Sequence, residues 1–591
     1  MQSSTGVPNF PGAVWLFTLP YGLTPDPLVA TLFAGLIGVV GVWGIWWLSR
    51  QVWDGWTSMG VALLLTAAPF IVFYSRSIWS QNLLPPLAIL WAVTAVHGIS
   101  RGDGRTLALH AFLSGFVGQV HLAGIALALG SLWLGLFFRL WRHWKPVTVG
   151  IVAGVMSAMP TIYTIAKYGD GAQSDIGTIL AQPSQTYPDN FTYLLNLAIG
   201  RDWEPFWLNG SWVWSAPLDT LLSAIISLLS VLLLTGVIFY GYRTSRLAKT
   251  MWQTVQNNEL LPRPEHVLVA LLPVWAVCSP LFFYQSRTDV FIQYMLASAP
   301  PLFLLMGAGI GWLSRRWLSI GFGVLCFGVA VVHTAAIVET LNTIGEVQVE
   351  GGMGTPLSYP RAAMEELKAD GREILIHSIG NTPEFDGDAA VFDVLLWGYP
   401  HRLVDGRSAL IIPREPAHLF ATFDTVPAWH ALPETVTNRE PLARRSNEPP
   451  YMVAHTDGQP DLDDSWETAD VSLQNGATLI GWRYFGLEDG RVRLETVWQL
   501  GDELGAGQIQ QFNHLYSTAD PDQPTHVSDA STSSNAWRAG DRLYTWAEFW
   551  PLPEGAELVR FDVGMYTWPD LQRSPVLDRE GDPLAPIQLV P

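Results

Sequence analysis

The first half of the chain is apolar, and the side chains that could do chemistry lie in short polar stretches that interrupt it. One stretch is Tyr74-Ser75-Arg76, with Trp79 and Asn82 shortly after it. The guanidinium of Arg76 can bind a phosphate through two parallel hydrogen bonds, and Tyr74, Trp79 and Asn82 would then line the site. The alternative is an interfacial arginine beside an aromatic belt residue, and the sequence leaves both interpretations open.

Two further stretches carry polar groups. Gln119-Val120-His121 would either line a substrate site or provide a hydrogen bond between helices. The segment that contains Arg287 and Asp289 is followed by Tyr294, a further candidate lining residue. Arg287 and Asp289 could also simply pair with each other, and an exposed ion pair contributes little to stability.

A long polar loop, residues 167–216, is the fourth candidate. Loops of this length without clear structure are usually functional or disordered, and the many Trp and Tyr residues argue against disorder. Its acidic residues are Asp170, Asp175, Asp189, Asp202 and Glu204.

Membrane spans must position these groups. Residues 1–340 carry 13 acidic and 16 basic residues, whereas residues 341–591 carry 39 and 17. The first part avoids charge because lipid cannot solvate it, and a span needs about 20 apolar residues. We predict ten spans, at 27–49, 57–74, 83–100, 106–118, 121–138, 147–166, 217–242, 266–284, 292–313 and 317–339. The run 106–138 is too long for one span, and Gly115, Gly118, Gln119 and His121 predict a break in its middle.

Basic residues predict the orientation. Twelve of them fall on one set of alternate loops, and only Arg76, Lys167, Arg201 and Arg287 fall on the other set. Because cytoplasmic loops carry the excess of Lys and Arg, the first set is expected to be cytoplasmic. Both termini and the acidic C-terminal part are then non-cytoplasmic.

The C-terminal part has an ordinary soluble composition. Its pattern predicts a small α/β domain over 341–435, a linker over 436–470 and a β-sandwich over 471–591. Exposed aromatics of the sandwich could stack on sugars, although any single one more often fills the core. The acidic charge argues against a nucleic-acid partner. No metal-ligand spacing or phosphate-binding glycine loop occurs, so we expect neither a metal nor another cofactor.

These residues give the chain a resemblance to the GT-C superfamily of membrane glycosyltransferases, and in it to the dolichyl-phosphate-mannose protein mannosyltransferase and aminoarabinose-transferase-like group. The resemblance covers about residues 1–340. It rests on Pro8–Leu28, on Pro69–Pro86 with Tyr74-Ser75-Arg76, and on Gly118-Gln119-Val120-His121-Leu122. The segment 476–591 is similar to β-rich modules on such proteins, through Phe512–Leu515, Trp537–Asp541 and Val563–Tyr566.

The resemblance implies a polytopic plasma-membrane enzyme that transfers a sugar from a polyprenyl-phosphate donor to a lipid, glycan or protein acceptor at the outer face. Basic side chains, here Arg76 and Arg287, would hold the lipid phosphate, and an outer-loop carboxylate would serve as base. The group's first span and the acidic motif after it would lie upstream of Met1. Asp202, Glu204 and Asp289 are therefore the candidate catalytic carboxylates.

Two other functions compete with this one. A catalytically incomplete membrane scaffold would present the β domain to carbohydrates or proteins, and the missing acidic motif motivates it. A transporter is disfavoured because the sequence has no inverted repeat and no acidic residue buried within a span, since Asp219 and Glu265 lie at span ends.

Overall fold

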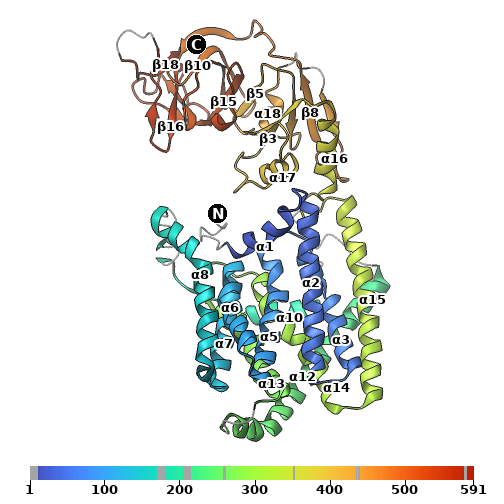
Figure 1. Ribbon diagram of the computed structural model, residues 1–591. Helices are drawn as coiled ribbons and strands as arrows, with labels where there is room; N and C mark the ends of the chain where they lie inside the picture. The colour runs from blue at the N-terminus through green and yellow to red at the C-terminus, as the bar shows by residue number, and fades with distance from the viewer. Residues whose placement is uncertain are drawn as a thin grey trace. The chain divides into compact units, whose positions relative to one another are not determined.

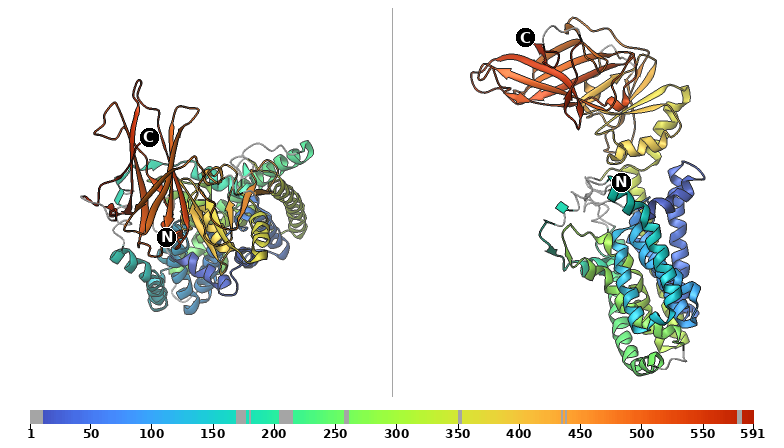
Figure 2. Two further views of the ribbon diagram at one scale, coloured as in Figure 1. Left: turned by 90° about the horizontal axis from the view of Figure 1, so that it is seen from above. Right: turned by 60° about the vertical axis from the view of Figure 1, so that its left-hand side comes forward.

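The structure is a computed structural model that describes residues 11–168, 177–178, 181–203, 215–256, 261–349, 353–433, 436, 439–577 and 582–591. The chain divides into two compact units (Figures 1 and 2). Unit 1 consists of Met1–Ile344 and Val349–Met353, and unit 2 consists of Gly345–Gln348 and Gly354–Pro591.

Unit 1 is a bundle whose helices lie side by side in both figures. Its α-helices are α1 (Gly12–Tyr21), α2 (Pro27–Arg50), α3 (Gly55–Thr66), α4 (Pro69–Tyr74), α5 (Leu84–Arg101), α6 (Gly104–Val120), α7 (Ala126–Phe137), α8 (Trp144–Tyr168), α10 (Asn190–Ile199), α12 (Ala216–Gln256), α13 (Pro264–Phe282), α14 (Pro300–Leu313) and α15 (Arg316–Glu346). Short 3-10 helices join them: η1 (Ser80–Leu83), η2 (Leu122–Ile125), η3 (Leu140–His143) and η4 (Ile292–Ser298). Strands β1 (Gln185–Thr186) and β2 (Gln285–Ser286) form an antiparallel pair.

The length and composition of these helices make the chain a multi-pass membrane protein. Among the described residues, six helices are long and apolar enough to cross a membrane, and η4 with α14 makes a seventh if the bent pair is one span. Asp26, Asp54 and Asp103 start α2, α3 and α6 by accepting backbone N–H groups of the first turn. The predicted spans 57–74, 106–118, 121–138 and 292–313 are short or broken helices instead.

The breaks have local causes. The predicted break in 106–138 is confirmed, because α6 ends at Val120 and His121 has an extended backbone before η2. Proline at position 69 starts α4 directly after Ala67 and Ala68, which separate it from α3. The axis bends by 51° between η4 and α14, where Pro300 occupies the first turn. The helix α1 has no counterpart among the predicted elements.

Unit 2 begins with a five-stranded sheet of order β4-β3-β6-β8-β7. The parallel strands are β3 (Glu373–Ser378), β4 (His401–Asp405) and β6 (Ala417–Ala421), and β8 (Tyr451–Thr456) and β7 (Arg439–Leu442) continue the sheet in antiparallel pairing. Helices α16 (Ser358–Leu367) and α17 (Gly387–Leu395) pack on one face, with η5 (Lys368–Asp370) after α16, and the short α18 (Pro427–His430) follows β6. The predicted α/β unit is therefore present.

A β-sandwich of two sheets completes unit 2. One sheet has the order β5-β15-β11-β10-β9, from β5 (Ala409–Ile412), β15 (Arg542–Phe549), β11 (Val492–Leu500), β10 (Ala477–Gly486) and β9 (Glu467–Ser472). The other is built on β12 (Gln508–Ser517) and β16 (Leu558–Trp568), with β13 (His526–Val527), β14 (Ala530–Ser531), β17 (Gln572–Arg573) and β18 (Ile587–Leu589). The turn η6 (Ser534–Ala536) precedes β15.

The structure differs from the predicted linker over 436–470. That segment contains β7 and β8, which complete the α/β sheet, and the edge position of β7 tolerates Pro441. Strand β5 lies within the predicted α/β segment but pairs with β15 of the sandwich. Arg402 on β4 forms two buried ion pairs, one within the α/β sheet to Glu373 at 2.9 Å and one to Asp541, next to β15 of the sandwich.

Candidate functional site

Several broken helices of unit 1 meet around η4. The hydroxyl of Tyr74, the last residue of α4, lies 3.4 Å from Oε1 of Gln293 in η4, and both side chains are buried. Interrupted helix at membrane depth persists only where protein buries it or where it lines a cavity. The three breaks therefore mark the interior of unit 1 as a candidate site.

His121 and Tyr294 are neighbours in this cluster. Their ring centroids are 5.4 Å apart, and the ring of Phe283 lies 5.1 Å from that of Tyr294. His121 Nδ1 accepts the backbone N–H of Ala123 at 3.1 Å, which fixes the imidazole at the start of η2. The structure thus brings together Tyr74, His121 and Tyr294, three residues that are far apart in the sequence.

The segment η1 supplies further polar groups. Asn82 donates from Nδ2 to the backbone oxygen of Ser77 at 2.7 Å and to its hydroxyl at 2.8 Å. The amide oxygens of Gln81 and Asn82 are buried and accept no hydrogen bond from the described residues. Trp79 is 45% exposed, with its ring 6.4 Å from that of Tyr74. This edge of the cluster thus has an accessible aromatic ring and two buried acceptors without a described donor.

Both predicted phosphate-binding residues are exposed cations. Arg76 follows α4 in a turn, and Arg287 lies between Ser286 and Thr288, whose hydrogen bonds shape the turn after β2. In the part of the chain that the structure describes, no carboxylate lies within ion-pair distance of either guanidinium, so Arg287 and Asp289 do not pair as the alternative interpretation required. Each cation is therefore available to an anionic ligand.

The candidate carboxylates differ in their surroundings. Asp289 is exposed and accepts the hydroxyl of Tyr187 at 3.2 Å. Asp202 accepts from Asn196 Nδ2 at 3.1 Å and lies 3.6 Å from the guanidinium of Arg201. Glu204 lies outside the described residues. No described contact joins Asp202 to Asp289, so the structure does not bring the two together.

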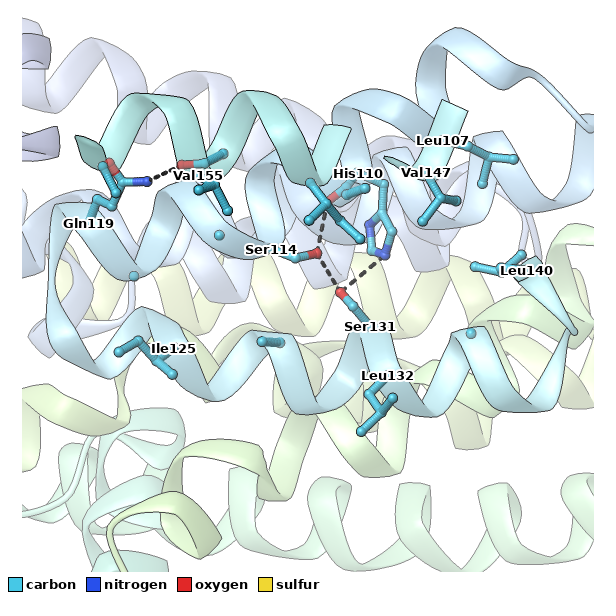
Figure 3. A pocket seen from close by; sticks show the side chains of 18 of the residues that line it. Leu107, His110, Ser114, Gln119, Ile125, Ser131, Leu132, Leu140, Val147 and Val155 are labelled. Atoms are coloured by element: carbon cyan, nitrogen blue, oxygen red, sulfur yellow. Dashed lines mark hydrogen bonds between the residues drawn. The ribbon is translucent and has the colours of Figure 1, made fainter. Parts of the chain in front are cut away.

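Gln119 lies on a different side of its helix from the cluster. Its Nε2 donates to the backbone oxygen of Gly154 and to the hydroxyl of Ser157, both at 2.9 Å, and so ties α6 to α8. The same side chain lines a cavity of about 720 Å³ among α6, α7 and α8 (Figure 3). The hydrogen bond between helices that the sequence left open for Gln119 is thus present.

The cavity is lined mainly by aliphatic side chains and small residues. Besides Gln119, its polar lining includes a hydrogen-bond cluster in which Ser131 contacts His110 Nε2 at 3.2 Å, with Ser114 beside it (Figure 3). Ser131 also accepts Trp91 Nε1 at 2.8 Å. Because these groups already satisfy one another, the cavity suits a hydrocarbon chain better than a sugar.

Sequence reasoning missed Tyr187, Asn190 and Asn196. Tyr187 binds Asp289, Asn190 donates to the backbone oxygen of Phe283 at 3.0 Å, and Asn196 binds Asp202. All three lie in the aromatic loop 167–216, but nothing in its composition separates them from their neighbours. Among the described residues, no three His, Cys, Asp or Glu side chains group so as to hold a metal ion.

No protein-family model and no curated protein sequence matches the chain. Among solved structures, ArnT from Cupriavidus metallidurans in the apo state is similar at 14% identity and a TM-score of 0.44, covering 76% of this chain and 87% of that chain. The same protein bound to undecaprenyl phosphate gives 14% identity, a TM-score of 0.43, and 76% and 89% coverage. Arabinofuranosyltransferase AftD from Mycobacteria is similar at 11% identity and a TM-score of 0.38, covering 94% of this chain and 55% of that chain. ArnT and AftD belong to the GT-C glycosyltransferases that the sequence resembles.

Proposed function

We propose that the protein transfers a sugar from a polyprenyl-phosphate donor to a lipid, glycan or protein acceptor at the non-cytoplasmic face of the plasma membrane. The observation that carries the proposal is the pair of exposed guanidiniums, Arg76 and Arg287, which no described carboxylate neutralises. Positive charge stabilises a phosphate leaving group, and a guanidinium binds it in bidentate fashion. The distribution of basic residues over the loops supports the orientation.

Asp289 is the better candidate for the base that takes the proton of the acceptor hydroxyl. It lies two residues from Arg287, and among the described residues its carboxylate accepts one side-chain hydrogen bond, from a neutral phenol. Asp202 is partly neutralised by Arg201 and carries a second bond from Asn196. A general base must be within reach of the hydroxyl and must have a lone pair free to take its proton, and a carboxylate without an ion pair keeps more of its lone pairs free.

Two further features support a lipid-linked sugar. The aliphatic cavity among α6, α7 and α8 extends to Gln119, two residues from His121, so a hydrocarbon chain held there would end near the broken helices. The exposed ring of Trp79 offers a stacking surface for a sugar, and the buried amide oxygens of Gln81 and Asn82 are acceptors without a described donor behind it.

The test is sugar transfer by the purified protein in proteoliposomes that contain labelled polyprenyl-phosphate sugars. Release of polyprenyl phosphate is measured for the native chain, Arg76→Ala, Arg287→Ala and Asp289→Asn. Loss of one charged hydrogen-bonding group costs about 1.5–3 kcal/mol, which is roughly a tenfold to hundredfold loss of kcat/KM for each arginine variant. Arg246→Ala, an exposed arginine on α12 that contacts Tyr242, is the matched control.

The proposal would be contradicted if the protein released polyprenyl phosphate from none of the labelled donors. Equal turnover in Arg76→Ala and Arg246→Ala would also contradict it. Undiminished turnover in Asp289→Asn would remove Asp289 as base without removing the transferase function.

A further inference from the structure

Two histidines of unit 2 face each other across the α/β sheet. His418 on β6 and His455 on β8 are directly opposite in the antiparallel register. His418 is buried, and a quarter of the His455 side chain, 26%, is exposed. Their ring centroids are 4.7 Å apart, and the two Nδ1 atoms are 2.7 Å apart. That separation is a hydrogen-bond distance, so one proton must lie between the two nitrogens.

Both outer nitrogens of the pair also have partners. His418 Nε2 lies 2.9 Å from Oδ1 of Asp370 in η5, and His455 Nε2 lies 3.0 Å from Oε1 of Glu440 on β7. The four side chains form one line of three contacts: carboxylate, imidazole, imidazole, carboxylate. An ionised carboxylate only accepts hydrogen bonds, so each end contact needs a proton on the imidazole.

Two neutral imidazole rings carry too few protons to make all three contacts of this line hydrogen bonds. Three contacts need three protons, and two neutral imidazoles carry one each. If each ring places its proton toward its carboxylate, two lone pairs face each other at 2.7 Å. If one ring turns its proton inward instead, its own carboxylate contact becomes a repulsion between lone pairs. Every assignment of tautomers therefore needs one additional proton.

The surrounding charges favour that proton. Asp370, Glu440 and Asp457 are the nearby carboxylates, and Arg372, which pairs with Asp370 at 3.2 Å and Asp457 at 3.3 Å, is the nearby guanidinium. Burial raises the pKa of Asp370, but the hydrogen bond from His418 and the charge of Arg372 lower it, and the net result lies below the ordinary value. Asp370 is thus an ionised neighbour that would stabilise a proton on the imidazole pair.

The other titratable groups near the pair are engaged elsewhere. His401 lies in the same row of the sheet but is separated from His418 by Ile374, and it bonds to Asp393 and the backbone of Tyr399. Lys368 donates to the backbone oxygen of Leu395, and the hydroxyl of Tyr399 donates to that of Arg372. Neither group supplies a charge directly at the two Nδ1 atoms.

We propose that His418 and His455 share this additional proton, and that the proton fastens β8, and the edge strand β7 behind it, to β6. Removal of the proton at alkaline pH leaves two lone pairs in contact across the strands, which drives the strands apart. The loop between β7 and β8 carries the buried ion pairs of Arg444 and Arg445 with Glu448, so the same proton holds that loop in place. This shared proton between His418 and His455 does not depend on the proposed sugar transfer.

Hydrogen exchange of the full chain in detergent tests the proposal. Amide protection in β6–β8 peptides is divided by protection in β12–β16 peptides from the same digest, from pH 6 to pH 8.5. This ratio cancels the intrinsic pH dependence of exchange. Because the folded pair binds one proton more than the opened pair, the ratio should fall by up to about tenfold per pH unit toward alkaline pH. In His455→Gln the ratio should be flat.

His401→Gln is the matched control, since it removes a histidine–carboxylate contact from the same row of the sheet. It should keep the pH dependence of the native chain. Should His455→Gln fail to fold, Glu440→Gln replaces it: the loss of one negative end should make the fall begin at lower pH. The proposal is overturned if His455→Gln and Glu440→Gln both show the same pH dependence of the protection ratio as the native chain. The proposal is also overturned if EDTA lowers this protection ratio of the native chain at pH 6.5 to its alkaline value. In that case a metal ion, and not a proton, would join the two histidines.

Discussion

The packing of α12 on α14 should depend on the absence of a side chain at Gly236. A Cβ atom added there would lie 1.8 Å from the backbone oxygen of Leu305, where ordinary contact begins at 3.4 Å, so α12 would have to move by about 1.6 Å. The obstacle is backbone and cannot rotate aside. Overpacking of this kind lowers the free energy of unfolding by about 1–3 kcal/mol, while alanine, as the better helix former, raises it by about 0.5–1 kcal/mol.

Gly241 on the same helix is the matched control, because a Cβ added there meets nothing within 4 Å. Gly241→Ala should gain the helix-forming contribution alone. The difference between the two variants is then the overpacking cost itself, and at roughly 2–4 °C per kcal/mol it corresponds to a melting temperature at least about 2 °C lower for Gly236→Ala. Scanning fluorimetry of the purified protein in detergent measures both. Equal melting temperatures would refute the argument that close backbone approach holds these helices together.

Three further predictions concern single side chains. Arg402→Met should destabilise unit 2 by about 3–5 kcal/mol, because Asp541 would keep a buried charge without its guanidinium partner and Glu373 would keep only the pair with the half-exposed Arg538. Arg361→Met, which removes one partner of a surface ion pair, should change stability by less than about 1 kcal/mol, and denaturant-dependent proteolysis of unit 2 compares the two variants. Burial lowers the pKa of His377 to about 4, so the unfolded chain takes up its proton first as the pH falls below about 6.5. Unit 2 should therefore lose roughly 3 kcal/mol between pH 6.5 and pH 4, and His377→Leu should flatten this loss in melting curves recorded against pH. Gln119→Leu should lower the thermal stability of unit 1 by only about 1 kcal/mol, as expected for one hydrogen bond between membrane helices, and a collapse of its melting transition would show a larger role.

The membrane part was predictable to the extent that hydrophobicity determines it. Apolar runs and Asp caps place the long helices, and the polar residues near His121 revealed the break after α6. The contact of Tyr74 with Gln293 was not predictable, since their separation of 219 residues is set by how broken helices pack. The candidate site was therefore predicted residue by residue, and its assembly came from the structure.

In the soluble part, local pattern predicted strands and missed their partners. The alternating runs Val492–Gln499 and Arg542–Trp550 predict strands, and the structure has β11 and β15 at these positions. Nothing in Ala409–Ile412 indicates that this strand pairs with β15 rather than with the nearer sheet. The segment of β7 contains Pro441 directly after the charged residues Arg439 and Glu440, and such a composition is typical of loops, so the edge strand was not predicted.

The pairing of β5 with β15 means that the sandwich is not a detachable module. A fragment that begins at residue 471, where the sequence suggests a domain boundary, would lack β5 and most of β9 and leave β15 with a row of unpaired backbone groups. Such an open edge recruits strands from other chains. Fusion partners, antigens or crystallisation fragments made from this region should therefore start before α16, and shorter ones are expected to aggregate although each retained strand is intact.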